Sequence, residues 1–201
     1  MAKKDIPAKD VAALRARTGA GMMDCKKALE EAGGDMEKAV DFLRTKGIMK
    51  AEKRAGRGTA QGLVSSYIHF NNRVGVLLEI NCETDFVART EDFQNLARDL
   101  ALHIASANPI AVSPDQVPAD VVAREKAIYL EQARESGKPA AVQEKMAEGK
   151  LKKFFEERVL LEQPYVKDDK QKVGDLVKAV SGKVGENVVV RRFARFELGN
   201  D

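Results

Sequence analysis

The stretch RVGVLLEINC, residues 73–82, decides the fold class of this chain. A period of two is typical of a β-strand with one buried face, because successive side chains of a strand point to opposite faces. Only Leu77 breaks the alternation. The apolar side chains stand at every second position, at Val74, Val76, Leu78, Ile80 and Cys82. We therefore predict a half-buried strand here.

Two more strands are predicted to pair with this one. Residues 63–70 form the preceding strand, and Asn71-Asn72 forms the hairpin turn, since asparagine tolerates a positive φ. Near the C-terminus, residues 187–198 hold valines and a phenylalanine, which favour strands. Together these segments predict a three-stranded antiparallel sheet.

Blocks of helix separate the strands. Thr90 can cap a helix whose apolar stripe runs from Phe93 to Ile104. Further helical patterns cover residues 119–136, residues 140–162 with a break at Gly149, and residues 172–183. Strands and helices in blocks, with no regular βαβ alternation, predict an α+β fold.

The first fifty residues have the period of helices. One helix is predicted over residues 7–18, with Gly19 as its end, and a third begins after Asp35 and stops near Gly47. The second helix between them has its apolar residues at i, i+3, i+4 and i+7, namely Cys25, Ala28, Leu29 and Ala32. Three such helices predict a small bundle.

The chain is accordingly divided into three parts. Residues 1–50 are the helical bundle, residues 51–59 a basic linker that contains two glycines, and residues 60–201 the α+β core. The two cysteines sit in apolar patterns, so we expect buried free thiols rather than a disulfide.

Composition sets the class of protein. The chain has 201 residues, of which 44% are apolar and 32% charged, as in a globular protein. No run of 18 apolar residues occurs, and the stretch from Met1 to Asp5 lacks the apolar segment of a secretory signal. We expect a cytoplasmic protein without a membrane segment.

The sequence holds none of the common motifs of catalysis or cofactor binding. The phosphate-binding patterns GxxxxGKS/T and GxGxxG, the metal patterns HExxH and CxxC, and the nucleophile pattern GxSxG are all missing. His103 lies beside an apolar stripe and is expected to be partly buried and hydrogen-bonded, whereas His69 is expected at the surface. We therefore predict a binding protein rather than an enzyme, with no cofactor and no metal site.

Basic residues gather in two places, although the net charge is only +3. They lie within residues 44–57 and 191–195. The plainer interpretation is a solvated helix end and a charged strand face, and the alternative is a phosphate-binding stripe. Few aromatic residues interleave with them, so direct nucleic-acid binding is not expected. An RNA-binding protein remains a rival that the salt dependence of affinity would test.

Two groups of residues do not belong to any apolar stripe. Met22 and Met23 follow Gly19-Ala20-Gly21 in the loop that enters the second helix, where they either plug the bundle or face a partner. The segment 84–87, with the sequence TDFV, occupies a short connection at the end of the strand. Its residues either cap a turn while Phe86 folds into the core, or they form a projecting wedge.

Four segments carry a family resemblance. They are LRARTGAGMMDCKKAL at 14–29, VLLEINCETDFVA at 76–88, EKM with GKLKKFF within 144–155, and LLEQPYVKD at 160–168. They lie in order along nearly the whole chain and are similar to the signatures of bacterial translation elongation factor Ts.

The resemblance implies a ubiquitin-associated-like bundle at the N-terminus and one main partner, the GTPase elongation factor Tu, from which the family releases GDP. It implies that Thr84, Asp85, Phe86 and Val87 displace magnesium in that GTPase. Met22 and Met23 would bind the same partner.

The chain also differs from the longer members of this family. By this resemblance it lacks a second copy of the core half and a coiled-coil insertion, which makes it similar to the short form. Short forms pair two chains, so the resemblance points to a homodimer. A ubiquitin-binding adaptor would explain the bundle alone and leaves residues 60–201 without a role.

Overall fold

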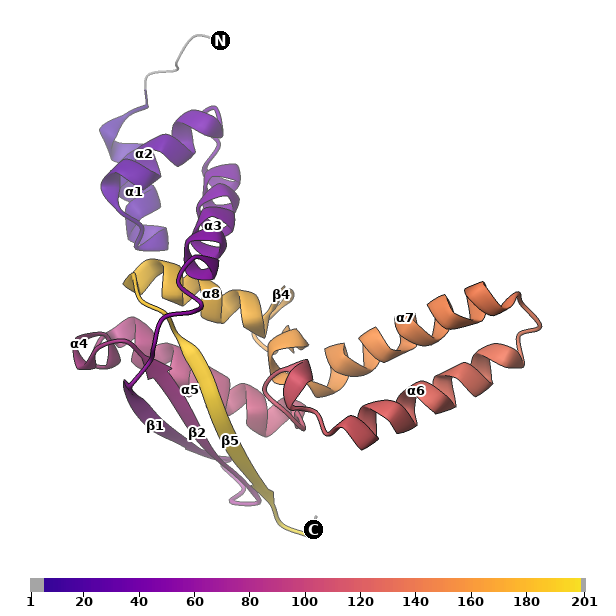
Figure 1. Ribbon diagram of the computed structural model, residues 1–201. Helices are drawn as coiled ribbons and strands as arrows, with labels where there is room; N and C mark the ends of the chain where they lie inside the picture. Colours follow the sequence, from indigo (N-terminus) through magenta and orange to yellow (C-terminus); the bar gives the residue numbers. More distant parts are fainter. Residues whose placement is uncertain (1–5, 200–201) are drawn as a thin grey trace.

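The computed structural model describes residues 6–199. The stretch from Met1 to Asp5, on which the expectation about a secretory signal rests, lies outside the described residues, as do the last two residues of the predicted core. Figure 1 shows a helical bundle above a sheet with its covering helices, and a long helical hairpin that extends to one side. This mixed architecture confirms the predicted α+β class.

The main sheet is antiparallel in the order β1-β2-β5. Its strands are β1 (Gln61–Ile68), β2 (Val74–Cys82) and β5 (Val189–Glu197). The central strand β2 buries Val76, Leu78, Ile80 and Cys82, as its alternation predicts. The three-stranded sheet is thus confirmed. A register shift after Glu79 lets both Val190 and Phe193 of β5 face the core.

The turn between β1 and β2 is longer than predicted. The amide of His69 donates to the carbonyl of Val74, which leaves four residues, 70–73, in the connection. Of the two asparagines, Asn72 alone has a positive φ, at 56°. Asn71 and Asn72 do lie in this turn, and Asn72 has the positive φ expected of it, but the connection is longer than these two residues.

Helix α5 (Glu91–Ala107) covers the inner face of the sheet, with Phe93, Leu100 and Ile104 fully buried. The hydroxyl of Thr90 accepts a hydrogen bond from the Phe93 amide at 3.4 Å, which confirms the predicted cap. Helix α8 (Val173–Val184) packs beside α5 and contributes Val173 and Val177 to the same apolar core.

The bundle consists of α1 (Ala8–Thr18), α2 (Met22–Glu31) and α3 (Met36–Glu52). The predicted end of α3 near Gly47 is wrong, because the helix continues to Glu52. A single glycine costs a helix only about 1 kcal/mol, and here α3 packs on α8 of the core, where Gly47 lies against Gly182. The predicted linker therefore begins within the last turn of α3.

The hairpin in Figure 1 is formed by α6 (Ala119–Arg134) and α7 (Ala140–Arg158), which pack against each other. Helix α7 runs unbroken through Gly149 and ends at Arg158, so the predicted break and the predicted end at 162 are both wrong. A short 3₁₀ turn follows it.

A second, small sheet was not predicted. It pairs β3 (Pro164–Tyr165) with β4 (Asp168–Lys172) and lies between α7 and α8.

Both cysteines are free and buried, as expected. Across residues 6–199, no helix is long and apolar enough to cross a membrane.

Candidate functional site

The segment 84–87 forms a single helical turn rather than an irregular connection. Helix α4 spans Asp85–Ala88, and Thr84 caps it: its hydroxyl oxygen accepts a hydrogen bond from the Val87 amide at 3.4 Å. The prediction that the next helix waits until Thr90 is therefore wrong. The signal available in the sequence was Thr84, because threonine is one of the residues preferred immediately before the first turn of a helix. The four residues that follow it contain no glycine or proline.

The side chains of this turn point in opposite directions. Phe86 is 77% exposed, whereas Val87 is 4% exposed and packs in the core together with Ala88. The alternative in which Phe86 folds back into the core therefore does not describe this structure. We call the exposed part, Asp85 and Phe86, the tip.

Asp85 is held only loosely. Its carboxylate forms an ion pair with Arg89 one turn later, with 2.8 Å between nitrogen and oxygen, and both side chains are mostly exposed. An ion pair this exposed contributes at most about 1 kcal/mol. The carboxylate can therefore leave Arg89 at little cost.

The backbone of the tip is held from the far end of the chain. The carboxylate of Glu186 accepts hydrogen bonds from the amides of Glu83 and Thr84, at 3.0 Å each, and from the hydroxyl of Thr84 at 2.6 Å. In return, the carboxylate of Glu83 accepts one from the amide of Asn187 at 2.7 Å. We call these mutual contacts the clasp. No sequence pattern indicated it.

Met22 and Met23 occupy the first turn of α2 and not the loop before it, contrary to the prediction. Gly21 is the residue that precedes the helix. Met22 is 48% and Met23 64% exposed, while Cys25 in the same helix is fully buried. The bundle core is therefore filled without them, and both methionine side chains lie partly in solvent.

Proteins of one known family are similar in sequence to this chain along nearly its whole length. Residues 47–200 match the family model described as Elongation factor TS. Elongation factor Ts of Syntrophobacter fumaroxidans is 53% identical over 197 residues, and the match covers 98% of each chain. Elongation factor Ts of Solidesulfovibrio magneticus is 55% identical over 196 residues, again with 98% of each chain covered. The chain belongs to the elongation factor Ts family.

A third relative gives the same result. Elongation factor Ts of Thermosipho melanesiensis is 55% identical over 194 residues, which are 96% of this chain and 99% of the relative. The tip and the clasp fall inside the matched family region. The two methionines precede residue 47, but the nearly full-length relatives align across them. The similarity to translation elongation factors therefore includes both the tip and the two methionines.

Part of the basic cluster in this elongation factor is already neutralised. Lys46 and Lys50 of α3 each donate to the carboxylate of Asp24, at 2.9 Å. These hydrogen bonds, first the one from Lys46, lower the pKa of Asp24 to about 2. Both lysines are therefore engaged within the bundle by Asp24, the residue that follows Met23 in sequence.

His103 forms hydrogen bonds, as predicted, but its burial is complete rather than partial. It is fully buried, its Nε2 lies 2.9 Å from Oε1 of Gln163, and its Nδ1 accepts from the Val166 amide at 3.3 Å. Since Nδ1 accepts, Nε2 carries the proton and donates to Gln163. Burial lowers the pKa of this histidine.

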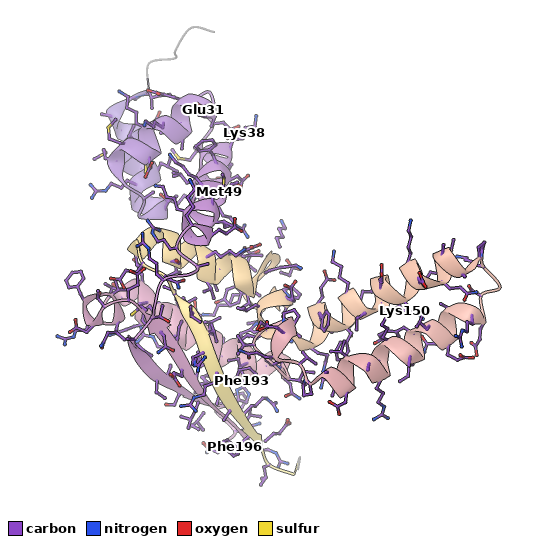
Figure 2. The ribbon with its side chains drawn as sticks, in the orientation of Figure 1. Glu31, Lys38, Met49, Lys150, Phe193 and Phe196 are labelled. Atoms are coloured by element: carbon purple, nitrogen blue, oxygen red, sulfur yellow. The ribbon has the colours of Figure 1, made fainter. Side chains whose placement is uncertain are left out.

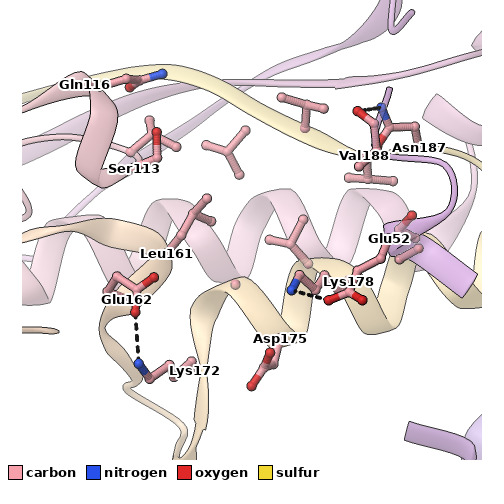
Figure 3. A pocket seen from close by; sticks show the side chains of 18 residues that line it. Glu52, Ser113, Gln116, Leu161, Glu162, Lys172, Asp175, Lys178, Asn187 and Val188 are labelled. Atoms are coloured by element: carbon pink, nitrogen blue, oxygen red, sulfur yellow. Dashed lines mark hydrogen bonds and ion pairs between the residues drawn. The ribbon is translucent and has the colours of Figure 1, made fainter. Parts of the chain in front are cut away.

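A cavity of about 410 Å³ lies between the end of α3, the start of β5 and α8. Figure 3 shows its floor of apolar side chains and its rim, where Lys178 pairs with Glu52 and Lys172 with Glu162. Asn187 reaches its wall and donates to the Arg57 carbonyl at 2.8 Å. Neither the tip nor the two methionines line this cavity.

Proposed function

We propose that the chain is a nucleotide exchange factor that releases GDP from the GTPase elongation factor Tu. The observation that carries the proposal is a phenylalanine, Phe86, that stands 77% exposed on a turn anchored in the core. A large apolar side chain held outside the core in this way is suited to enter a partner. The factor acts by binding and makes or breaks no covalent bond, so it is not an enzyme.

The energetic task of such a factor can be stated. A nucleotide held at nanomolar affinity has a binding free energy of about −12 kcal/mol. Every tenfold gain in its release rate requires the factor to lower the barrier by about 1.4 kcal/mol. The factor does so by binding the nucleotide-free GTPase more tightly than the loaded one. Incoming nucleotide weakens the factor's binding by the same amount, and the factor is released.

In this proposal the four residues of the turn divide the work. Phe86 is the wedge that displaces a helix supporting the partner's phosphate loop. Asp85 leaves Arg89 and disturbs the groups that order the water around the partner's magnesium ion, the largest positive charge beside the phosphates. Thr84 caps the turn and Val87 anchors it in the core.

Met22 and Met23 supply a second contact. They project from the first turn of α2, and their flexible, polarisable side chains adapt to an apolar surface. We propose that they dock the bundle on the nucleotide domain of the GTPase. The contact holds the factor in place while the tip acts.

The test of the exchange function is the release of a fluorescent GDP analogue from elongation factor Tu, followed with and without this chain. We expect release to accelerate with factor concentration until it saturates. A release rate that stays the same at every factor concentration would contradict the proposal. Adding salt should weaken RNA binding steeply if the rival function applied, so a gel shift at two salt concentrations separates the two.

We further propose that two chains pair through the outer face of the sheet. This face lies opposite α5 and carries apolar side chains that are each at least half exposed: Val64, Ile68, Leu77 and Phe196. Figure 2 shows Phe196 near the end of β5, whereas Phe193 on the same strand packs on the core. A flat apolar face can pair with its own copy about a two-fold axis.

Light scattering coupled to gel filtration tests the pairing. We expect the mass of a dimer for the native chain and the mass of a monomer for Phe196→Glu, because a charge would be buried in the interface. A monomeric native chain would refute the pairing and leave the exchange function untouched.

A further inference from the structure

The tip cannot hold its own geometry. Helix α4 has four residues, and a single turn is far below the length at which a helix is stable in water. Val87 and Ala88 fix its buried side, but they do not fix the strand end from which it starts. The direction of Phe86 therefore depends on what holds Glu83 and Thr84.

The clasp supplies this hold through charge-assisted hydrogen bonds. One carboxylate oxygen of Glu186 receives both backbone amides, and the other receives the Thr84 hydroxyl. The same hydroxyl accepts from the Val87 amide, so the bonds run continuously from Glu186 into α4. Charged acceptors make the stronger class of hydrogen bond.

Glu186 is itself fixed in place. Gly185 ends α8 in the left-handed conformation, with φ of 82°, and its amide donates to the Ser181 carbonyl. The Ser181 hydroxyl donates to the carbonyl of Glu186. The next residue, Asn187, donates its amide to Glu83 and its side chain to the Arg57 carbonyl beyond α3. The carboxylate is thus presented from a rigid turn that also touches the segment leading to the bundle.

We propose that Glu186 is the positioning residue of the tip: it orients Phe86 for the partner without touching the partner's nucleotide site. For its effect on exchange, this inference rests on the function proposed above. Its effect on the backbone of the tip does not. The two can therefore be tested separately.

The first experiment measures GDP release from elongation factor Tu over a range of factor concentrations. Glu186→Ala should lower the saturating rate at least about tenfold, with little change in the half-saturating concentration. Glu186→Gln should restore part of the rate, because its amide oxygen can accept both backbone amides, although a neutral acceptor forms weaker hydrogen bonds than a carboxylate. Glu91→Ala removes an equal charge near the tip, from an exposed side chain with no hydrogen bond or ion pair within residues 6–199, and should match the native chain.

A native saturating rate in Glu186→Ala would overturn the proposal. So would an equal loss in the Gln variant, which would indicate charge rather than position, or a loss confined to the half-saturating concentration. If the native chain itself fails to accelerate release, the exchange function is what fails.

The second experiment needs no partner. Amide hydrogen exchange, followed by NMR in the free chain, should be at least about tenfold faster at Glu83 and Thr84 in Glu186→Ala than in the native chain. Exchange at Leu78 in the middle of β2 should stay the same, which shows that the fold is intact. Unchanged protection of Glu83 and Thr84 would overturn the positioning role whatever the result with the GTPase.

Discussion

The N-terminal bundle and the core each carry one of the proposed contacts, but they hold it in different ways. In the bundle, Met22 and Met23 project from the first turn of a helix and are placed by the local sequence alone. In the core, Phe86 stands on a short turn that Glu186 holds from a hundred residues away. The methionines can adapt to a surface, while the phenylalanine is presented in one direction.

Under the proposed function, this difference assigns affinity and rate to separate parts of the molecule. A flexible apolar contact contributes to binding whatever the state of the partner, and uniform binding of this kind does not accelerate a step. A rigid wedge fits the nucleotide-free form better than the loaded form, and that difference is what lowers a release barrier. Changes in the two regions should therefore affect different kinetic constants.

The largest effect is expected from Phe86→Ala. Removal of the wedge should raise the barrier to GDP release by about 2–3 kcal/mol, which lowers the saturating rate roughly 30- to 150-fold. The free energy of unfolding should hardly change, because the side chain is mostly exposed. Stopped-flow release of labelled GDP at saturating factor measures the first quantity, and urea unfolding the second.

Phe70→Ala is the matched control, since Phe70 is even more exposed and lies in the turn at the other end of β1. It should leave the saturating rate at the native value. If Phe86→Ala released GDP at the native saturating rate, the proposed difference between the bundle contact and the core contact would be wrong.

The bundle and the core also show how much of the structure can be predicted from the sequence. The alternation along 74–82 and the cap at Thr90 were predicted because each depends on neighbouring residues. The sequence predicts a loop at Met22 and Met23 because the two glycines of Gly19-Ala20-Gly21 obscure the start of α2, and Gly47 wrongly indicates the end of α3. The role of Glu186 could not be predicted, because two turns 102 positions apart meet only when β2 and β5 pair.

Gly182→Ala should loosen the docking of the bundle on the core. A methyl group at Gly182 would lie 2.8 Å from the carbonyl oxygen of Gly47, so α3 would have to move away from α8. The expected cost is about 1–3 kcal/mol in urea unfolding, as for other overpacked contacts.

Gly47→Ala tests the same contact from its other side. A methyl group there meets nothing within 4 Å, so this variant should be neutral or slightly stabilising. Equal stabilisation in both variants, which is what helix propensity alone predicts for Gly→Ala, would show that the close approach of the two helices does not decide the result.

Met23→Ala should weaken binding to the GTPase by about 1–2 kcal/mol and leave the saturating release rate unchanged. The exposed methionine is an adaptable contact, so its loss affects the complex before and after nucleotide release alike. Titration calorimetry with nucleotide-free elongation factor Tu measures the affinity. Met49→Ala, a control at an exposed methionine of α3, should bind like the native chain. A lowered saturating rate in Met23→Ala would place the methionine with the wedge.

The smallest effect, a response to mild acid, should separate the bundle from the core in stability. Burial lowers the pKa of His103, so the folded core resists a proton that the unfolded chain accepts as the pH falls below about 6.5. The unfolded state then binds more protons, and the core loses stability between pH 7 and pH 5.5. Both histidines lie outside the bundle. Its Asp24, with a pKa of about 2, contributes stability that is lost only as the pH falls below about 4.

Thermal unfolding followed by amide NMR at pH 7 and pH 5.5 distinguishes the two parts residue by residue. Signals of β2 and α5 should be lost at a lower temperature at pH 5.5, while signals of α1 and α2 should not shift. His103→Gln removes the titrating group next to Gln163 and Val166, so its unfolding temperature should be lower at pH 7 but less dependent on pH over this range. An equal shift of bundle and core would mean that the two unfold as one unit, because the docking of α3 on α8 then couples them more strongly than the charge on one histidine separates them.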